Sequence, residues 1–366
     1  MNICIIGDGL TSLSLAKILI NKKINVHIYK KTENSNLPWG RTIGIAKNNL
    51  DFFKKEICSL SKKDMWKIKK IEIYSEKLKD NKILNFEDNN KDLFYLLKND
   101  VLYSTLRNKL IKSKYFKKII IKKNNIYEKL LQGSKYDLVI NCDPNNIIAK
   151  KFFFKKIDKD YFNIAYTTIL KHEKLENNTA IQIFTKLGPI AYLPISKSET
   201  SVVCSVEIKN KLYNKDEVLD LIRKNNPKYK INKISKLNSF KLKSSSLRNY
   251  YYKNILSFGD SLHKIHPLAG QGFNMTIRDI KVLSGIIQDR INLGLELDSL
   301  VFKEFEKKTK HINFIFSKGI DFIYEFFNFD KKIKNKNLNK ILKFFGNKKL
   351  LNNIFIKYAD KGLNVW

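Results

Sequence analysis

Apolar residues follow two different periods in the N-terminal part of the chain. Residues 2–6 form a short apolar run of the kind found in buried strands, and residues 10–21 place apolar side chains at helical spacing. A second strand-like run follows at residues 24–29. A strand, a helix and another strand in this order predict a β-α-β unit, in which the two strands are parallel and the crossover is right-handed.

The same order of patterns returns further along the chain. Residues 254–258 have the pattern of a strand and residues 275–287 that of a helix, with a polar, glycine-containing loop between them. Such a loop suits a polar cofactor, because its backbone N–H groups and the positive end of the helix point toward the same bound group.

The middle of the chain favours strands over helices. Residues 161–170 and 201–207 have strand-like patterns, and apolar residues alternate in the run 184–195. Two prolines, Pro189 and Pro194, fall in that run. Because proline has no backbone N–H to donate, we expect both at a sheet edge or a bulge.

Composition and charge narrow the class of protein. The chain has 366 residues, enough for two domains, and its 43% hydrophobic content is that of a globular protein. Its formal net charge of +35 predicts attraction to anionic surfaces, although a general bias toward lysine explains most of it. Only six of the 70 basic residues are arginine, the residue that reads bases and phosphates best, so we expect no specific nucleic-acid binding.

Cysteine usage and hydropathy bear on location. The four cysteines lie far apart, without a C-x-x-C pair, which favours free thiols in a reducing compartment and predicts no metal site. No basic region precedes the first strand, so a signal peptide is not expected. No stretch approaches the roughly 20 apolar residues that span a bilayer. We expect a cytoplasmic protein that is not integral to a membrane.

Residues 7–12, Gly-Asp-Gly-Leu-Thr-Ser, connect the first strand to the first helix. This is the G-x-G-x-x-G dinucleotide fingerprint with Ser12 in place of the last glycine. Gly7 permits the tight turn, Gly9 lets a pyrophosphate approach the helix N-terminus, and the small Ser12 lets the helix pack closely on the strand. The motif predicts dinucleotide binding because it lies within a β-α-β unit. The alternative interpretation is a glycine turn that binds no ligand.

A second motif carries a resemblance to a known family. Residues 259–274 read Gly-Asp-Ser-Leu-His-Lys-Ile-His-Pro-Leu-Ala-Gly-Gln-Gly-Phe-Asn. They closely resemble the second FAD motif of the FAD-dependent aromatic hydroxylases of the para-hydroxybenzoate hydroxylase type, in the form found in ubiquinone-biosynthesis hydroxylases. Residues 40–45 are similar to the loop whose arginine contacts the flavin side of the cofactor, and residues 184–195 to the G-P-x-A-x-L-P strand of these hydroxylases. The resemblance runs from residue 2 to about residue 300.

The resemblance implies an α/β fold, in which a Rossmann-like FAD-binding domain carries an inserted, mostly antiparallel sheet as substrate domain and is followed by a helical C-terminal region. The expected units are the discontinuous FAD-binding domain (1–75, 98–150 and 250–300), the substrate-binding sheet domain (76–97 and 151–249) and the helical C-terminal region (301–366).

The resemblance also implies a cofactor and a reaction. FAD is the expected cofactor and NAD(P)H the expected electron donor; reduced FAD would form a flavin hydroperoxide that hydroxylates an electron-rich ring. The residues expected to bind FAD are Gly7, Gly9, Ser12, Arg41, Asp260, Pro267, Gly270, Gln271, Gly272 and Asn274. His266 and Pro267 are the expected catalytic residues beside the flavin. For His266, as for His263, support of the loop through hydrogen bonds is the alternative role.

Three positions depart from the pattern of the family. Lys30 stands at the end of the second strand, where an acidic residue is expected to bind the adenosine ribose, and Glu33 comes three residues too late. Tyr103 replaces the asparagine of a V-x-N-x-x-L motif, and Pro144 replaces the glycine of an Asp-Gly motif. A lysine near the ribose could also favour a phosphate-bearing partner.

The expected function is an FAD-dependent aromatic-ring monooxygenase that acts on a polyprenylated ubiquinone precursor. The alternatives are a related flavoenzyme with another substrate, and a non-catalytic relative that binds lipid or scaffolds quinone biosynthesis. Within residues 331–361, lysines surround an apolar helical face formed by Ile341, Leu342, Phe344 and Phe345. Such a helix suits an anionic membrane surface at the inner face of the membrane, or it packs on the main body. The expected partners are thus the substrate, this surface and a quinone-biosynthesis complex.

Overall fold

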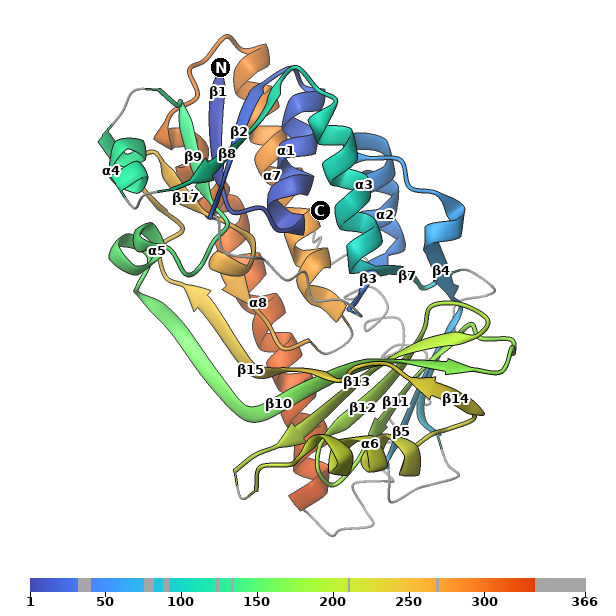
Figure 1. Ribbon diagram of the computed structural model, residues 1–366. Helices are drawn as coiled ribbons and strands as arrows, with labels where there is room; N and C mark the ends of the chain where they lie inside the picture. Colours follow the sequence, from blue (N-terminus) through green and yellow to red (C-terminus); the bar gives the residue numbers. More distant parts are fainter. Residues whose placement is uncertain are drawn as a thin grey trace.

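The fold consists of two stacked bodies, each built on a sheet (Figure 1). A computed structural model describes residues 1–31, 41–75, 82–87, 92–122, 125–132, 135–209, 211–267 and 270–332. A long helix, α8 (Ser299–Lys332), runs along both bodies (Figure 1). The predicted α/β fold with a Rossmann-like unit and a second, mostly antiparallel sheet is confirmed.

The upper body holds a six-stranded sheet. Its strands are β1 (Asn2–Ile6), β2 (Asn25–Lys31), β8 (Phe116–Ile121), β9 (Leu138–Asn141), β16 (Tyr251–Tyr252) and β17 (Ile255–Ser257). Their order across the sheet is β16-β17-β9-β1-β2-β8, and all neighbours are parallel except β16 and β17. Helix α1 (Leu10–Asn21) connects β1 to β2, so the predicted N-terminal β-α-β unit is confirmed.

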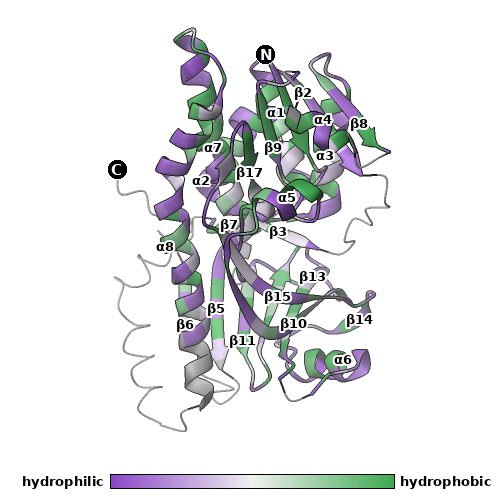
Figure 2. Ribbon diagram, turned by 90° about the vertical axis from the view of Figure 1, so that its left-hand side faces the viewer, coloured by the Kyte–Doolittle hydropathy of each residue, from purple (hydrophilic) through white to green (hydrophobic). Residues whose placement is uncertain are grey.

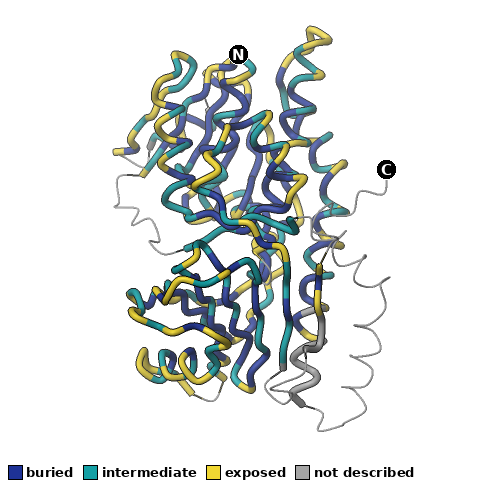
Figure 3. Tube along the Cα trace, turned by 90° about the vertical axis from the view of Figure 1, so that its right-hand side faces the viewer, coloured by how far each residue is buried: buried dark blue, intermediate teal, exposed yellow. Residues whose placement is uncertain are grey.

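Helices cover both faces of this sheet. Strand β1 shows the consequence: Ile3, Cys4 and Ile5 point alternately to opposite faces of the sheet, and each is fully buried. Helix α1 packs against two further helices, α3 (Asn99–Ile111) and α7 (Gln271–Asn292). Two short helices, α4 (Asn125–Gln132) and α5 (Ile147–Phe152), flank β9 in sequence. The central strands β1, β9 and β17 are buried almost throughout, in keeping with the buried interior of this body (Figure 3).

The lower body holds a nine-stranded sheet. Its strands are β5 (Lys70–Ser75), β6 (Lys82–Glu87), β10 (Lys156–His172), β11 (Thr179–Phe184), β12 (Pro189–Pro194), β13 (Glu199–Glu207), β14 (Ile231–Ile234), β15 (Asn238–Leu247) and β18 (His263–Lys264). The order is β18-β15-β10-β13-β12-β11-β5-β6, with β14 also paired to β10. Among these pairs only β11 and β5 are parallel. Helix α6 (Lys215–Lys224) packs Val218 and Ile222 into the apolar cluster on one face.

The prolines of β12 correct one expectation from the sequence. Strand β12 lies inside the sheet, between β11 and β13, and not at an edge. Pro189 is its first residue and Pro194 its last. At the ends of a strand the missing N–H removes no hydrogen bond from the middle of the ladder, and this position allows proline in an interior strand.

A small three-stranded sheet lies between the two larger ones. It consists of β3 (Thr42–Ala46), β7 (Phe94–Lys98) and β4 (Met65–Ile68), all antiparallel to their neighbours. A short helix, α2 (Lys47–Phe52), follows β3 directly. This sheet brings β3, and Arg41 just before it, beneath the start of α7, since β3 and α7 are in contact.

Helix α8 contacts both bodies in turn. Its first part buries Phe302 and Phe305 in the core of the upper body, and further on Phe316 packs against Met275 of α7. Tyr324 then joins the apolar cluster of the lower sheet. Apolar and polar segments alternate along the helix (Figure 2). None of the helices in the described part of the chain is long and apolar enough to cross a membrane.

The lysine-rich C-terminal segment with its expected amphipathic helix falls almost entirely beyond Lys332 and so lies outside the described residues. Glu33 also lies outside the described residues, in the range 32–40. The division of the chain into an FAD-binding domain, a substrate domain and a C-terminal region stays a prediction.

Candidate cofactor site

Loops from the carboxyl ends of three adjacent strands meet at the edge of the six-stranded sheet that faces the lower body (Figure 1). Gly7 follows β1, Asp143 follows β9, and Gly259 follows β17. A Cβ atom added to Gly7 would lie 3.4 Å from the backbone nitrogen of Asp143, and one added to Gly259 would lie 2.5 Å from Cγ2 of Thr11. The two sequence motifs, at 7–12 and 259–274, are therefore in direct contact. Ligands of open α/β sheets bind at this edge.

The first motif leaves room for a bound group. Gly7 has a φ of +104°, which a residue with a Cβ atom rarely adopts. A Cβ atom added to Gly9 would meet nothing within 4 Å, and no side chain caps the helix N-terminus that Gly9 begins. Ser12 is fully buried in the first turn of α1. The N-terminus of α1 is thus open to an anion such as a pyrophosphate.

The second motif ends in a left-handed residue at the start of α7. Gly270 has a φ of +64° and is the N-cap of the helix, with no side-chain cap. A Cβ atom added to Gly272 would make only an ordinary van der Waals contact, 4.0 Å from Cγ1 of Ile265. The Oε1 atom of Gln271 is buried, and no described residue forms a hydrogen bond with it. Asp260 lies in a 3₁₀ turn, Gly259–Ser261, and its side chain is exposed.

Asn274 has a different environment from its neighbours in the motif. Its Oδ1 atom accepts hydrogen bonds from the Ala46 N–H and from Asn49 Nδ2, both at 2.9 Å, and its Nδ2 donates to the Gly44 carbonyl at 2.8 Å. The side chain therefore fastens α7 to β3 and α2. Any contact of Asn274 with the cofactor stays a prediction. No motif of the sequence pointed to Asn49.

Arg41 reaches the same region from the start of β3. Its guanidinium carbon lies 4.3 Å from the ring centroid of Phe240, on β15 of the lower sheet. Its Nε atom is buried and has no hydrogen-bond partner within the described part of the chain. Burial lowers the pKa of Arg41, and the charge of Asp260 partly opposes this shift. Arginine still remains a cation, so the site holds a half-buried positive charge that suits an anionic or electron-rich group.

His266 lies in a buried aromatic cluster. Its ring centroid is 4.7 Å from that of Tyr161 on β10 and 4.3 Å from that of Tyr324 on α8. Tyr161 in turn donates a hydrogen bond to Asp321. Burial, helped by the charge of Lys159, lowers the pKa of His266 to about 3, so the imidazole is neutral at neutral pH. None of the aromatic and acidic partners in this cluster was predicted from the sequence.

His263 forms a separate buried pair. Its Nε2 atom lies 2.5 Å from Oδ2 of Asp279 on α7, and Oδ1 of Asp279 accepts from Nδ2 of Asn313 on α8 at 3.1 Å. These contacts agree with the supporting role that was the alternative for His263.

Pro144 stands where the family pattern has the glycine of an Asp-Gly motif. Beside it, the Oδ1 atom of Asp143 accepts a hydrogen bond from the Asn145 N–H at 2.9 Å, so an Asx turn replaces the missing glycine.

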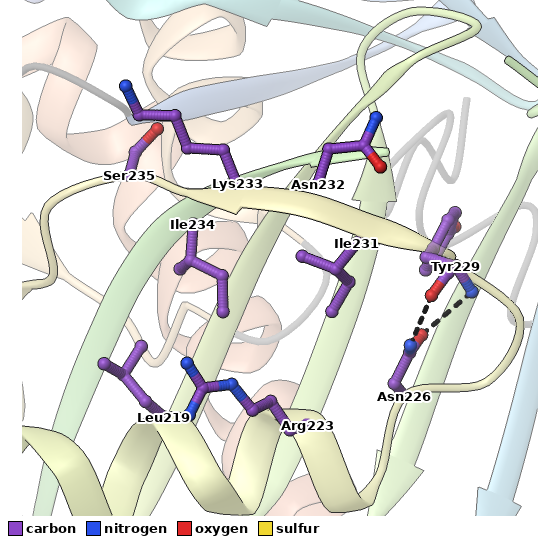
Figure 4. Close-up of a pocket in the computed structure, with 9 residues that line it drawn as sticks. All are labelled: Leu219, Arg223, Asn226, Tyr229, Ile231, Asn232, Lys233, Ile234 and Ser235. Carbon is purple, nitrogen blue, oxygen red and sulfur yellow. Dashed lines mark hydrogen bonds between the residues drawn. The ribbon is translucent and has the colours of Figure 1, made fainter. Parts of the chain in front are cut away.

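One surface cavity lies away from these loops. It has a volume of about 530 Å³ and is lined by Leu219 and Arg223 of α6, by Asn226 and Tyr229, and by residues 231–235. Figure 4 shows Arg223 and Leu219 below the strand that carries Ile231 and Ile234, with Asn226 hydrogen-bonded to Tyr229. None of the predicted site residues lines it. We therefore assign the chemistry to the loops at the carboxyl ends of the six-stranded sheet.

The chain is similar to known FAD proteins in sequence and in fold. Residues 173–292 match a family model described as an FAD binding domain. The mitochondrial ubiquinone biosynthesis monooxygenase COQ6 of Dictyostelium discoideum is 23% identical over 88% of this chain and 81% of its own length. The 3-demethoxyubiquinol 3-hydroxylase of Escherichia coli is 29% identical over 51% of this chain and 50% of its own length.

Solved structures agree in fold. The p-nitrophenol 4-monooxygenase PnpA of Pseudomonas putida has a TM-score of 0.77 at 11% identity, over 99% of this chain and 98% of its own. The probable FAD-dependent monooxygenase pqsL of Pseudomonas aeruginosa has a TM-score of 0.68 at 12% identity, over 97% of this chain and 99% of its own.

Fold and comparisons together define the class: the protein has the fold of solved FAD-dependent monooxygenases, and its residues 173–292 match the model of an FAD binding domain. The resemblance to the FAD-dependent aromatic hydroxylases, and among them to the ubiquinone-biosynthesis hydroxylases, is confirmed. The site residues fit this cofactor, since Arg41 and Gln271 have buried polar atoms without hydrogen-bond partners among the described residues, and Gly9 leaves open space. The role of each residue stays a prediction.

Proposed function

We propose that this protein is an FAD-dependent monooxygenase that hydroxylates the aromatic ring of a polyprenylated ubiquinone precursor, with NAD(P)H as electron donor. The observation that carries the proposal is the likeness to a ubiquinone biosynthesis monooxygenase over most of both chains. It is supported by the contact between the two glycine motifs at the carboxyl ends of β1 and β17.

The chain contributes binding, orientation and exclusion of water. When bound and reduced, FAD supplies the oxygen-activating chemistry. Gly7 and Gly9 would hold the pyrophosphate at the N-terminus of α1, and Gly270 and Gln271 would present the start of α7 to the flavin. Arg41 would stabilise negative charge on the cofactor, because its cation is held in place by Phe240 and partly shielded from water.

The phenol ring of the substrate would lie on an apolar part of the lower sheet. Ala165, Val203, Phe240 and Leu242 belong to one cluster there, and Phe240 also touches Arg41. A dry, apolar floor beside the half-buried cation keeps water from the reacting ring. His266 would position Pro267 rather than move a proton, since burial keeps the imidazole neutral.

The first test is the visible spectrum of the purified protein, with chromatography of the released chromophore. We expect a flavin spectrum and FAD. Oxidation of NADH or NADPH should then depend on an added short-chain prenylated phenol, with a hydroxylated product detected by mass spectrometry. FAD-loaded protein that gives no hydroxylated product from any such phenol would contradict the proposed substrate and favour a related flavoenzyme.

A non-catalytic relative is the second candidate function, and the three departures at Lys30, Tyr103 and Pro144 favour it. A colourless protein that also fails to take up added FAD would support this candidate. We further propose that the protein works in the cytoplasm at the inner face of a membrane, within reach of a quinone-biosynthesis complex, because lysine-rich residues 331–361 suit an anionic surface.

A further inference from the structure

Asp8 is the centre of a charge cluster at the first glycine motif. It lies between Gly7 and Gly9, directly after β1. Its Oδ2 atom is 2.9 Å from Nζ of Lys30 at the end of β2 and 3.6 Å from Nζ of Lys118 on β8. The hydroxyl of Tyr103, on α3, donates to the same oxygen at 3.2 Å. Four elements thus meet at one carboxylate.

Two of the three departures from the family pattern converge here. Lys30 stands where the ribose-binding acid is expected, and Tyr103 where an asparagine is expected, yet both contact Asp8. A lysine has three donors and no acceptor, so Lys30 cannot accept a hydrogen bond from a ribose hydroxyl. The carboxylate that the end of β2 lacks is present one strand away, on the neighbouring loop.

We propose that Asp8 replaces the acid at the end of the second strand as the acceptor for a hydroxyl of the adenosine ribose of FAD, and that Lys30, Lys118 and Tyr103 hold its carboxylate in place. This inference rests on the FAD binding of the proposed function. The ribose-binding role would thus move from the end of β2 to the loop after the neighbouring strand β1.

The hydrogen bonds of Asp8 leave one oxygen available. All its partners among the described residues contact Oδ2, and none contacts Oδ1. The side chain is 14% exposed, so it lies near the surface of the loop and can reach a ligand. Burial, followed by the charge of Asp8, raises the pKa of Tyr103 to about 12. The phenol therefore stays protonated and donates to Oδ2 at neutral pH.

The cations around Asp8 explain why a carboxylate is tolerated in this loop. An acid beside the pyrophosphate of a dinucleotide would repel it unless its charge were neutralised. Lys30 and Lys118 supply that neutralisation, and Arg107 adds a third positive charge that acts on Lys118 and Tyr103. Burial lowers the pKa of Lys118, and Asp8 opposes this shift, as expected for a cation that depends on its partner.

A ribose that carries a phosphate is the competing ligand, since Lys30, Lys118 and Arg107 are all cations. Asp8 argues against it, because the carboxylate already engages both lysines and would repel a phosphate placed beside them. The two ligands differ by one group on the same ring. Analogues of the adenosine half of FAD therefore distinguish them.

The experiment is a titration of the flavin-free, full-length protein with FAD, followed by flavin fluorescence. Asp8→Asn should weaken FAD binding by about tenfold or more, because it removes a charged acceptor. The double variant Asp8→Ala with Lys30→Glu returns an acid to the end of β2 and should regain most of the affinity. Asp289→Asn removes one exposed carboxylate at the far end of α7 and should bind FAD like the wild type.

A second readout uses displacement of FAD by ADP, by 2′,3′-dideoxy-ADP and by ADP with a 2′-phosphate. The wild type should prefer ADP over the other two, and Asp8→Asn should no longer distinguish ADP from the dideoxy compound. Thermal unfolding of each variant shows that it is folded, and the double variant keeps the test decisive if Asp8→Asn is unstable.

The outcomes separate the inference from the proposed function. Equal FAD affinity of the wild type and Asp8→Asn, or no recovery in the double variant, would overturn the role of Asp8 alone. Tighter binding of the 2′-phosphorylated ADP would overturn it in favour of a phosphate-bearing ligand. A wild-type protein that binds neither FAD nor ADP would contradict the proposed function and, with it, this inference.

Discussion

At the scale of single residues, contacts between elements decide which glycines matter. Gly259 has a φ of +63°, and an added Cβ atom would lie 2.5 Å from Thr11. We expect Gly259→Ala to lower the free energy of unfolding by about 1–3 kcal/mol, through backbone strain and the clash. Thr11→Ala in the same chain should recover the part due to the clash, and thermal denaturation measures both.

Gly285 is the matched control for this variant. It lies inside α7, and an added Cβ atom would meet nothing within 4 Å. Gly285→Ala should stabilise the protein by up to about 1 kcal/mol, since alanine favours a helix. If Gly259→Ala were as well tolerated as Gly285→Ala, the two motifs would not touch as described.

The buried imidazole of His266 predicts a dependence of stability on pH. Its pKa is about 3 in the folded protein, against an ordinary value of 6.5. Below pH 6.5 the unfolded chain therefore binds a proton that the folded chain does not, and the folded state loses stability as the pH falls toward about 3. The slope contributed by this group is at most about 1.4 kcal/mol per pH unit.

His266→Phe keeps an aromatic ring in the cluster and removes the titration. Urea denaturation at pH 7, 6 and 5 should show a smaller loss of stability on acidification in this variant than in the wild type. His172→Gln, which removes a buried imidazole outside this cluster, is the comparison. Parallel pH profiles of His266→Phe and the wild type would contradict the buried, neutral imidazole.

At the scale of elements, Asn274 predicts how α7 is fastened to the small sheet. Asn274→Ala would leave the Ala46 N–H and the Gly44 carbonyl without their partners. We expect a loss on the order of 2–4 kcal/mol in the free energy of unfolding, since these groups are buried. Asn292→Ala, at the exposed end of α7, should cost far less and is the control. Equal losses of unfolding free energy in the two variants would mean that the hydrogen bonds of Asn274 to β3 do not stabilise the packing of α7.

Elements with continuous apolar patterns were predictable, and those shaped by their neighbours were not. The sequence predicted β1 and α1 with their observed bounds, because both are buried by apolar residues at a regular period. Strand β10 spans 156–172, well beyond the predicted 161–170. Its charged first residues gave no strand signal, and pairing with β15 extends it. Helix α7 begins at Gln271 instead of Met275, since Gly272 obscured its first turn.

The candidate site was predictable where a motif is local. Gly7, Gly9, Arg41 and Gly270 stand in short segments whose residue order implies a loop. The partners that give these residues their environment come from distant parts of the chain: Phe240 covers Arg41, and Lys118 reaches Asp8. Such contacts follow from sheet order, which one sequence without its fold does not specify.

At the scale of the whole molecule, the net charge of +35 predicts attraction to anionic membrane surfaces. A chain truncated after Phe329 loses the lysine-rich C-terminal residues. We expect it to bind anionic liposomes more weakly than the full chain, with the larger difference at low salt, while its FAD content stays the same. Sedimentation with liposomes measures the first and the visible spectrum the second. Neutral liposomes are the control, and unchanged binding to anionic ones would refute a role for this segment.

The order of strands in the upper sheet sets a condition on how the protein is made. Strand β17 pairs with the edge of β9, but it follows β9 in the sequence by more than a hundred residues. All strands of the lower sheet except β5, β6 and β18 lie between β9 and β17 in the sequence. During synthesis β9 therefore waits with an open edge, where another chain could pair with it. The second glycine motif and α7 come later still. A growing chain can thus complete its cofactor site only once the start of α7 has been synthesised, after most of the strands of the lower sheet.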